Sequence, residues 1–394
     1  MLRCFTLAVL VCCVLRAETV LVLPFANHSA AANLDWIGES IAETVRDSLA
    51  SQGLLVLDRE GRLEGYRRLS LRPGTELTRA SIIKLGESLD ASIVIYGEYQ
   101  QQPAGDAKDA SKGSLRLVGR VLDLKRTRQS PPFSHFGALE ELPGMEVQLG
   151  WEALRQIESD TPVTEAEFAR LHPAVRLDAM ESYARGLIAT LPEQRHRFFT
   201  QAARLDDKFS QPCLQLGKEA WEQKDYKTAA GWFQRVSLGD PRYYQAQFLM
   251  GLSRYYAGDA AAAAQSFQVV ADAVPLNEVF NDLGAAQVRR NDLPAAIAAF
   301  RKAIDGDDAD PDYHFNLGYA LWRLKDFDGA VESLRAALER DANDTEATTL
   351  LGRALKQEGP RPGDPRSEGR QRVKTNFDEF AYRQLQAELA TRKE

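Results

Sequence analysis

Histidines and acidic residues are the side chains of this sequence that could perform acid–base or metal chemistry. The five histidines (His28, His135, His172, His196 and His314) show neither the two-histidine helical spacing nor the neighbouring carboxylates of a metal site. The sequence contains no G-x-S-x-G elbow, P-loop or G-x-G-x-x-G motif. Because no nucleophile can be paired with a base, we predict a non-enzymatic protein that needs no cofactor or metal.

The acidic run Asp305–Asp312 (DGDDADPD) is the remaining candidate for a cation site. It has some likeness to a calcium loop but lacks the glutamate expected at the twelfth position. We interpret it as a solvated turn, with calcium binding as the alternative, and His314 as a packing residue.

A ladder of apolar-Gly pairs in the second half of the chain is the strongest pattern. Leu216-Gly217, Met250-Gly251, Leu283-Gly284, Leu317-Gly318 and Leu351-Gly352 recur at intervals of 34, 33, 34 and 34 residues. Such a period is typical of helical hairpins that bury their apolar faces only by stacking. An alanine lies twelve residues after each of the first four glycines, with Phe or Leu four residues further on. These small and large residues are expected to let helix backbones approach and to fill the space between hairpins.

This pattern resembles the tetratricopeptide repeat (TPR) family. Turn signals at Lys224-Asp225, Gly258-Asp259, Asn291-Asp292 and Lys325-Asp326 separate the two helices of each unit at one phase. A degenerate first unit lies at 179–209, and 345–358 supplies one closing helix. We therefore expect an all-α TPR superhelical solenoid over 179–358, with about five hairpins and a closing helix.

The resemblance implies a concave groove lined by the first helix of each hairpin. Transferring the family's groove positions onto this sequence gives Lys218, Trp221, Phe248, Leu252, Tyr255, Tyr256, Asn281, Arg289, Phe315, Tyr319, Trp322, Arg323, Arg353 and Lys356. The alternative is that individual aromatic residues simply pack between repeats. Because aromatic residues and arginine are enriched at interface hot spots, we expect a peptide ligand with aromatic or apolar side chains and some acidic character. The family's paired clamp for a terminal carboxylate is missing from these positions.

The first half of the chain alternates strand and helix patterns. Strands are expected at 19–25, 54–57, 91–99, 115–124 and 133–139, and helices at 33–50, 78–89 and 142–157. The polar segment 101–113 is expected to be a solvated hairpin tip. This order predicts a mixed sheet covered by helices, which is an α/β sandwich, over 18–158, and a linker at 159–178.

This half resembles the TolB amino-terminal-like domain, which is akin to FlgO and CsgG-type proteins of bacterial envelopes. The resemblance rests on VLVLPFAN (20–27), LDWIG (34–38), ASIVIYG (91–97) and RVLDL (120–124). It implies an envelope protein that binds proteins or polymers, and it supplies no catalytic residue.

The amino terminus predicts export from the cytoplasm. A positive start, the apolar run Cys4–Leu15 and a small residue at Ala17 are typical of a signal peptide at 1–17. Lipidation at Cys12 or Cys13 is the less favoured alternative, because neither cysteine follows a small residue. Only Cys213 lies beyond this segment, so no disulfide is expected, which fits a periplasmic or secreted protein. The net charge of -7 argues against nucleic-acid binding.

The carboxyl terminus predicts a flexible linker and one more helix. The stretch 359–372 is rich in Pro, Gly and Arg. The segment 373–394 is expected to be an amphipathic helix, capped by Asn376 and Glu379, that covers the end of the array or engages another protein.

The sequence favours one function and leaves a second open. The first is an exported adaptor of the bacterial envelope, at most peripheral to the membrane, that binds a protein or peptide in the TPR groove. The second is an envelope sensor whose α/β domain binds a small molecule or cell-wall polymer while the TPR array docks a partner. An enzyme with an unrecognised site is a third alternative.

Overall fold

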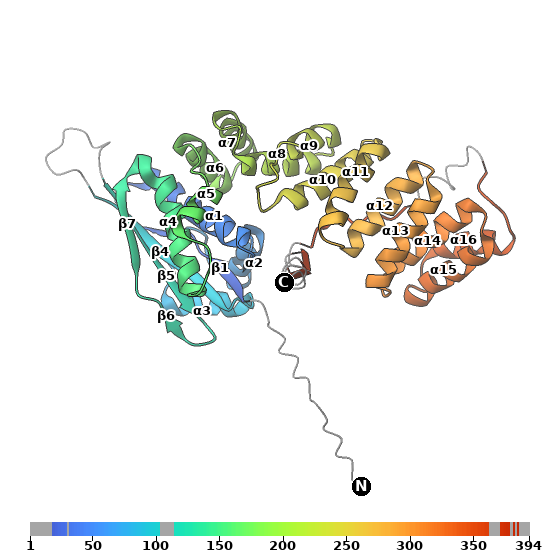
Figure 1. The fold of residues 1–394 in the computed structure, drawn as a ribbon, viewed down its shortest axis with the longest axis horizontal. Coiled ribbons are helices and arrows are strands. Elements are labelled where there is room, and N and C mark those ends of the chain that lie inside the picture. The colour runs from blue at the N-terminus through green and yellow to red at the C-terminus, as the bar shows by residue number, and fades with distance from the viewer. Residues whose placement is uncertain are drawn as a thin grey trace, which may run out of the picture.

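The computed structural model describes residues 18–29, 31–102, 114–361, 371–378, 381–382 and 384–385 (Figure 1). The predicted signal peptide and most of the predicted hairpin tip lie outside these residues. A mixed-sheet domain is followed by a long helical array, which confirms the predicted fold class.

The amino-terminal domain contains a seven-stranded sheet in which strands β3, β1, β4, β5 and β6 lie side by side. β1 pairs in parallel with β3 and β4, whereas β5 pairs antiparallel with β4, β6 and β7. The short β2 also pairs with β4. The strands are β1 (Thr19–Val22), β2 (Ala26–Asn27), β3 (Leu55–Val56), β4 (Ile93–Gln102), β5 (Ser114–Asp123), β6 (Arg128–Gln129) and β7 (Phe133–Ala138).

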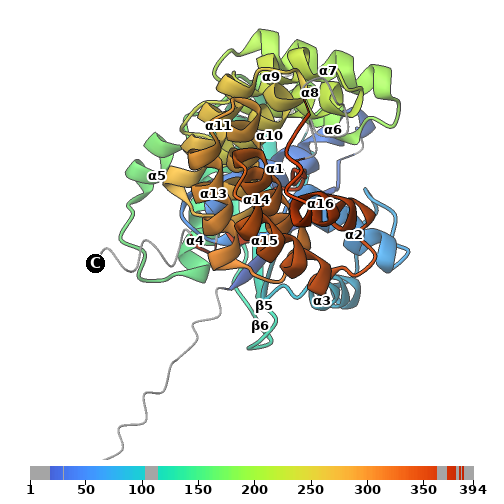
Figure 2. The same cartoon turned by 90° about the vertical axis from the view of Figure 1, so that its right-hand side faces the viewer.

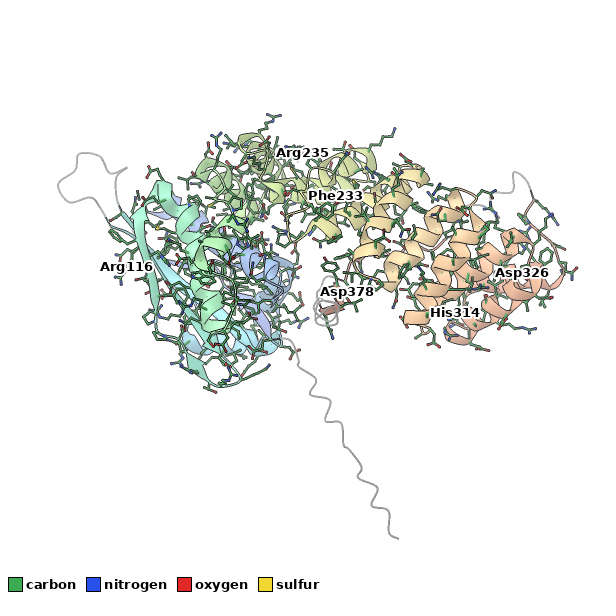
Figure 3. The ribbon with its side chains drawn as sticks, in the orientation of Figure 1. Arg116, Phe233, Arg235, His314, Asp326 and Asp378 are labelled. Atoms are coloured by element: carbon green, nitrogen blue, oxygen red, sulfur yellow. The ribbon has the colours of Figure 1, made fainter. Side chains whose placement is uncertain are left out.

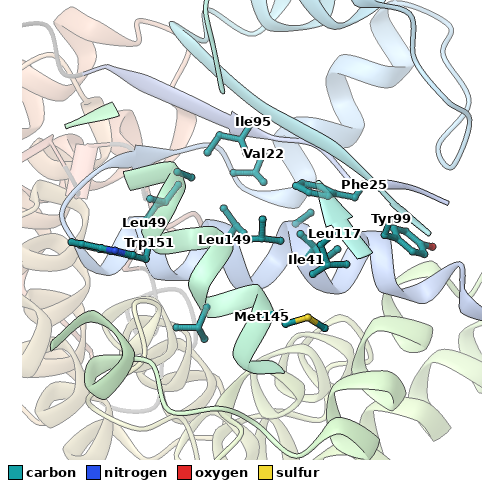
Figure 4. Packing of buried hydrophobic residues seen from close by; sticks show 14 of the residues in the cluster. Val22, Phe25, Ile41, Leu49, Ile95, Tyr99, Leu117, Met145, Leu149 and Trp151 are labelled. Atoms are coloured by element: carbon teal, nitrogen blue, oxygen red, sulfur yellow. The ribbon is translucent and has the colours of Figure 1, made fainter. Parts of the chain in front are cut away.

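Helices cover both faces of this sheet because β1 carries apolar side chains in both directions. Val20 and Val22 pack with α1 (Trp36–Ser51) and α4 (Leu142–Ile157), while Leu21 and Leu23 face α2 (Arg59–Arg68) and α3 (Arg79–Ser88). Alternate side chains of a strand point to opposite faces, so a continuous apolar run fits a strand buried on both sides. Figure 4 shows α1 and α4 side chains packed against the first face.

Helix α2 is absent from the predicted elements. Its sequence REGRLEGYRR holds two glycines and few apolar residues, so it lacks a clear helical stripe. One of the glycines has a packing reason, because a Cβ on Gly65 would lie 2.7 Å from a methyl carbon of Leu89 and 2.8 Å from one of Leu85. The close approach of α2 to α3 therefore stabilises a helix whose composition alone does not predict it.

The helical array consists of successive antiparallel pairs followed by one unpaired helix (Figures 1 and 2). The paired helices are α6 (Leu177–Ile188) and α7 (Pro192–Leu205), α8 (Ser210–Glu222) and α9 (Tyr226–Phe233), α10 (Tyr243–Tyr256) and α11 (Ala260–Ala273), α12 (Asn277–Arg289) and α13 (Leu293–Gly306), and α14 (Pro311–Leu324) and α15 (Phe327–Arg340). The unpaired helix is α16 (Thr345–Leu355).

Each ladder glycine that lies in a hairpin packs against the large side chain of the second helix of that hairpin. A Cβ on Gly217, Gly251 or Gly284 would lie 2.5 to 2.7 Å from the ring of Phe233, Phe267 or Phe300. By contrast, a Cβ on Gly352 of α16 would meet nothing within 4 Å. The expected role of the small and large residues is therefore present in the hairpins and ends where the pairing ends.

The turns inside the hairpins explain the repeated Asp. Lys224, Asn291 and Lys325 adopt positive φ of 60°, 63° and 66° and end the first helix of their units. The following aspartate then caps the second helix; Asp292, for example, accepts a hydrogen bond from the backbone N–H of Ala295.

The first repeats pack directly on the α/β domain. Met180 and Ala184 of α6 belong to the same apolar cluster as the sheet and α1. The predicted linker at 159–178 contains α5 (Glu165–Leu171), whose Phe168 is fully buried with its ring 5.6 Å from Trp151. The two parts of the molecule therefore share a core.

A buried group of charges strengthens this interface. Arg242, at the start of α10, forms ion pairs with Asp47 of α1 and with Asp240, and lies 4.0 Å from Glu43. Gln211 of α8 donates to Asp47 at 2.9 Å. These ion pairs and this hydrogen bond link α10 and α8 to α1. Removing a charge from such a buried group is costly, so these residues hold the array in place against α1.

Candidate functional site

The concave side of the array is occupied by a remote segment of the same chain. We call the described residues 371–378, 381–382 and 384–385 the tail segment. It lies along α10, α12 and α14, and Figure 3 places Asp378 on this concave side.

The main chain of the tail segment is held by side chains of two neighbouring repeats. Asn281 of α12 and Asn316 of α14 each donate to the carbonyl oxygen of Arg372 at 2.8 Å. The N–H of Arg372 donates to Asn316 Oδ1 at 2.9 Å, and the N–H of Lys374 donates to Asp282 Oδ1 at 2.8 Å. All three groove side chains are fully buried. These contacts require an extended main chain and are independent of the side chains it carries.

The Arg372 guanidinium enters an acidic pocket. Its two terminal nitrogens donate to the two oxygens of Asp344 at 2.7 and 2.8 Å. Asp312 lies 3.2 Å away and Glu346 3.4 Å away, while the ring of Phe315 lies beneath the guanidinium with its centroid at 3.7 Å. The planar, two-pronged contact with Asp344 is a geometry that arginine provides and lysine does not.

Lys374 is held by a second pair of carboxylates. Its Nζ lies 2.7 Å from both Asp310 Oδ2 and Asp312 Oδ2, and 5.3 Å from the ring centroid of Tyr313. Burial alone would lower the pKa of Lys374, but its contacts with Asp310 and Asp312 raise it above the ordinary value. The lysine is therefore held in its charged form.

Further along, the tail segment is apolar. The ring of Phe377 lies 5.6 Å from Phe248 of α10 and 5.3 Å from Tyr382. Tyr382 is only 3% exposed, and its ring lies 5.8 Å from Tyr244. Val373, Ala381 and Leu385 pack against the same cluster. The groove thus has an acidic end over α14 and α16 and an aromatic end over α10.

The two carboxyl oxygens of Asp282 differ in their hydrogen bonding. Its Oδ1 accepts hydrogen bonds from Asn281 and from the N–H of Lys374, whereas its buried Oδ2 has no hydrogen-bond partner within the described part of the chain. Burial raises the pKa of Asp282 well above the ordinary value. A protonated carboxyl at this position carries no charge and needs no counterion.

Four of the predicted groove residues touch the tail segment. Phe248 and Phe315 contact Phe377 and Arg372 as described, Asn281 binds the main chain, and Tyr255 donates from its hydroxyl to Gln371 at 3.2 Å.

Two others contact the chain just after α16. Trp322 donates from its indole N–H to the carbonyl oxygen of Glu358 at 2.7 Å, and Arg353 donates to that of Gly359 at 3.0 Å.

The remaining predicted residues lie elsewhere in the packing. Leu252 and Tyr319 are fully buried core residues. Arg289 lies over the ring of Tyr255 at 3.5 Å, and Arg323 donates to Asn291 at 3.1 Å. Lys356 is the exposed cap of α16.

Three residues near the start of the array complete this set. Tyr256 is 41% exposed and stacks on Tyr226, and Trp221 packs on both of these tyrosines. Lys218 faces the α/β domain, with its Nζ 3.8 Å from Glu60 of α2.

Sequence reasoning missed the acidic half of the groove. Asp282, Asn316 and Asp344 are absent from the predicted set. Asp310 and Asp312 belong to the run interpreted as a solvated turn, and that interpretation is wrong for these two half-buried residues. The high proportion of Asp in the run 305–312 was the sequence signal that could have indicated an acidic binding site. Among the described residues, no group of three or more His, Cys, Asp and Glu could hold a metal ion.

One further expectation needs correction. The predicted helix from residue 373 is wrong for 373–378, which have no regular secondary structure, and the helical turn beyond them is capped by Asp378 rather than Asn376.

The groove side chains that meet this segment at Arg372 and Lys374 are carboxylates. These carboxylates favour a basic segment, whereas the sequence favoured a ligand with some acidic character.

The molecule is a helical-repeat solenoid joined to an α/β domain. A tetratricopeptide repeat family model matches residues 214–278 and 281–345. Residues 214–345 therefore contain TPR repeats, a class of helical repeat that typically serves in protein–protein interaction. The comparison with curated proteins gives no match.

Several solved structures are similar to parts of this chain. The structure of MamA (41-end) from Desulfovibrio magneticus RS-1 is 24% identical, with a TM-score of 0.38, over 42% of this chain and 95% of that chain. YrrB, described as a TPR protein with an unusual peptide-binding site, is 17% identical, with a TM-score of 0.36, over 43% of this chain and 87% of that chain. The LpoB C-terminal domain from Salmonella enterica is 16% identical, with a TM-score of 0.24, over 31% of this chain and 83% of that chain.

Within the described residues, no helix has both the length and the apolarity needed to cross a bilayer.

Proposed function

We propose that this protein is an exported, non-enzymatic adaptor of the bacterial envelope that binds an extended segment of a partner protein in its TPR groove. The groove is the surface over α10, α12, α14 and α16 on which the tail segment lies. The carrying observation is that Asn281 and Asn316 both bind the main chain of a segment that is remote in the sequence. Main-chain recognition of this kind suits any extended partner that also satisfies the flanking side-chain sites.

Replacing the buried aromatic residues of the groove would not test binding alone. Tyr255, Tyr319 and Trp322 are at most 1% exposed, so their replacement by alanine would open cavities in the array as well as change the groove. The two asparagines are better probes because they donate to the bound segment itself.

Export and envelope location are supported by the sequence. The first seventeen residues have the pattern of a signal peptide, and the amino-terminal half resembles domains of envelope proteins. The seven-stranded sheet with helices on both faces is compatible with that resemblance.

The test compares partners captured from the envelope fraction of the native host. The bait is the full chain as wild type, as Asn281→Ala/Asn316→Ala, or as Asn343→Ala, an exposed asparagine in the turn before α16. We expect a partner that is retained by wild type and by Asn343→Ala and is lost with the double variant. Identical partners for all three baits would contradict groove binding.

A cleft on the α/β domain favours the sensor as the second candidate. It has a volume of about 490 Å³ between α4, α5 and β7, and its lining includes Phe136, Met145, Trp151, Phe168 and His172. Such an apolar cleft could receive a small molecule. Thermal-shift screening of the full chain tests it: a ligand-dependent rise in Tm that is lost in Phe136→Ala, whose side chain is 62% exposed, would favour the sensor.

A further inference from the structure

The tail segment shows which side chains the groove accepts as well as how it holds a main chain. Arg372 and Lys374 are two residues apart in an extended stretch, so their side chains point to the same side. Both enter the acidic end, whereas Val373 between them packs against the apolar cluster.

The acidic end is complementary in charge to the tail segment. Asp310, Asp312, Asp344 and Glu346 place four carboxylates against the two cations of the tail segment. Although burial by itself raises the pKa of Asp344, hydrogen bonds from Arg372 lower it below the ordinary value. Asp344 is therefore ionised when Arg372 fills the pocket, and the pocket is complementary in charge to a basic segment.

Two of these carboxylates also cap helices, and this contact fixes their positions. Asp310 caps α14 and Asp344 caps α16, each accepting a backbone N–H of its helix. Their rotamers are therefore set before a ligand arrives, which reduces the entropy lost on binding. The buried asparagines and Asp282, whose Oδ2 has no hydrogen-bond partner among the residues that the structure describes, adjoin the same stretch of main chain.

The aromatic end sets a third requirement. Phe377 lies three residues beyond Lys374 and packs on Phe248, which is fully buried. The distance between the acidic and aromatic ends thus fixes the spacing between the basic pair and the aromatic side chain.

We propose that the groove selects partner segments in which an arginine is followed two residues later by a lysine and five residues later by a phenylalanine, in an extended conformation. The tail segment, with Arg372, Lys374 and Phe377, carries this pattern and competes with the partner for the groove. This inference rests on the proposed function, because it names the class of peptide that the groove takes. The apparent affinity for a partner is reduced in proportion to the fraction of molecules in which the tail segment is bound.

The test uses the full chain and a fluorescent synthetic peptide of residues 371–385. In the chain, Arg372→Glu/Lys374→Glu releases the tail segment without touching the groove. By fluorescence anisotropy we expect the peptide to bind this variant at least about tenfold more tightly than wild type, which corresponds to about 1.4 kcal/mol. Binding should weaken steeply with added salt, since the acidic pocket is only partly buried.

Peptide variants then test the pattern. Replacing the peptide's Arg372 by alanine, or its Lys374 by alanine, should weaken binding by about tenfold or more, and Arg372→Lys should also weaken it because the two-pronged contact is lost. Thr375→Ala, at an exposed position, is the matched control and should bind as the parent peptide does.

A variant of the groove distinguishes a loss of binding from a loss of folding. Asp312→Asn/Asp344→Asn keeps a capping side chain at α16 but removes two charges, so circular dichroism should be unchanged while peptide binding falls. A scrambled peptide that binds as tightly as the parent, or equal binding to wild type and to the released variant, would overturn the proposal.

These outcomes separate the motif from the groove. Partner capture that depends on Asn281 and Asn316, combined with no preference for the parent peptide, would leave groove binding intact and reject only the Arg-Lys-Phe pattern.

Discussion

Asn281 and Asn316 lie 35 positions apart on adjacent repeats, yet both donate to one carbonyl oxygen, that of Arg372. Asn316 also donates to Asn281 Oδ1 at 2.7 Å, so the two amides form a continuous row across α12 and α14. Such a row can hold a main chain only while the two repeats keep their stacking. Binding in the groove is therefore coupled to the geometry of the array.

We expect Asn316→Ala to release the main chain around Arg372. Loss of these buried hydrogen bonds should cost about 1 to 2 kcal/mol, which is roughly a 5- to 30-fold fall in protection. Hydrogen exchange at the amides of Arg372 and Lys374 measures it. Asn343→Ala is the control, and unchanged protection in Asn316→Ala would contradict the assignment.

Gly284→Ala should destabilise the array. The new Cβ would lie 2.6 Å from the ring of Phe300, so we expect a loss of about 1 to 3 kcal/mol in the free energy of unfolding. Gly352→Ala is a matched control at the same ladder position, because a Cβ there meets nothing within 4 Å. It should be neutral or stabilise α16 by up to about 1 kcal/mol. Equal effects in urea unfolding would refute the packing role of the ladder.

Arg242→Ala should loosen the array from the α/β domain. It removes a buried cation from Asp47, Asp240 and Glu43, of which Asp47 and Glu43 keep Arg46 as a partner, at a cost of up to about 3 to 5 kcal/mol. Thermal unfolding measures the loss, and X-ray scattering should show a larger radius of gyration.

An exposed ion pair serves as the control for Arg242→Ala. The side chains of Arg176 and Asp178 are 61% and 50% exposed, so Arg176→Ala should leave thermal unfolding nearly unchanged. A comparable loss in both variants would argue against a special role for the interface charges.

Glu146 should make the stability of the protein depend on pH. It is fully buried with Thr44 donating at 2.6 Å, and burial raises its pKa from the ordinary 4.5 to about 8. Between these values the folded protein holds a proton that the unfolded chain releases. The contribution of Glu146 to stability is therefore fully present below about pH 4.5 and falls, by up to about 1.4 kcal/mol per pH unit, as the pH rises toward 8.

Glu146→Gln should remove this dependence, because glutamine stays neutral and keeps the bond from Thr44. Urea unfolding at pH 5, 7 and 9 measures the effect, with the exposed Glu332→Gln as control. A slope that persists in Glu146→Gln would assign the pH effect to other groups.

Regular patterns of residues made most of the fold predictable. The Gly–Phe spacing and the Asp caps act within one hairpin, so a single unit such as Gly284, Asp292 and Phe300 already specifies its own geometry. Helix α2 was missed because its stability depends on the contact of Gly65 with α3, which no local pattern records.

The groove was predictable only in part. Phe248, Asn281 and Phe315 follow from the repeat phase, and each contacts the tail segment. The acidic end combines Asp312 and Asp344 from different repeats with Arg372 from beyond the array. That meeting depends on how the chain turns back on itself, which sequence spacing does not determine.

The shared core of α1 and α6 has a consequence for the assembly that the adaptor would build. Met180 and Ala184 of α6 pack in the same core as the sheet. The array is therefore joined to the α/β domain by a packed interface rather than by a flexible hinge. A segment held by Asn281 and Asn316 would then stand at a set distance and direction from the sheet surface. Two partners bound at the two ends would be spaced and oriented by the protein, and not merely brought together.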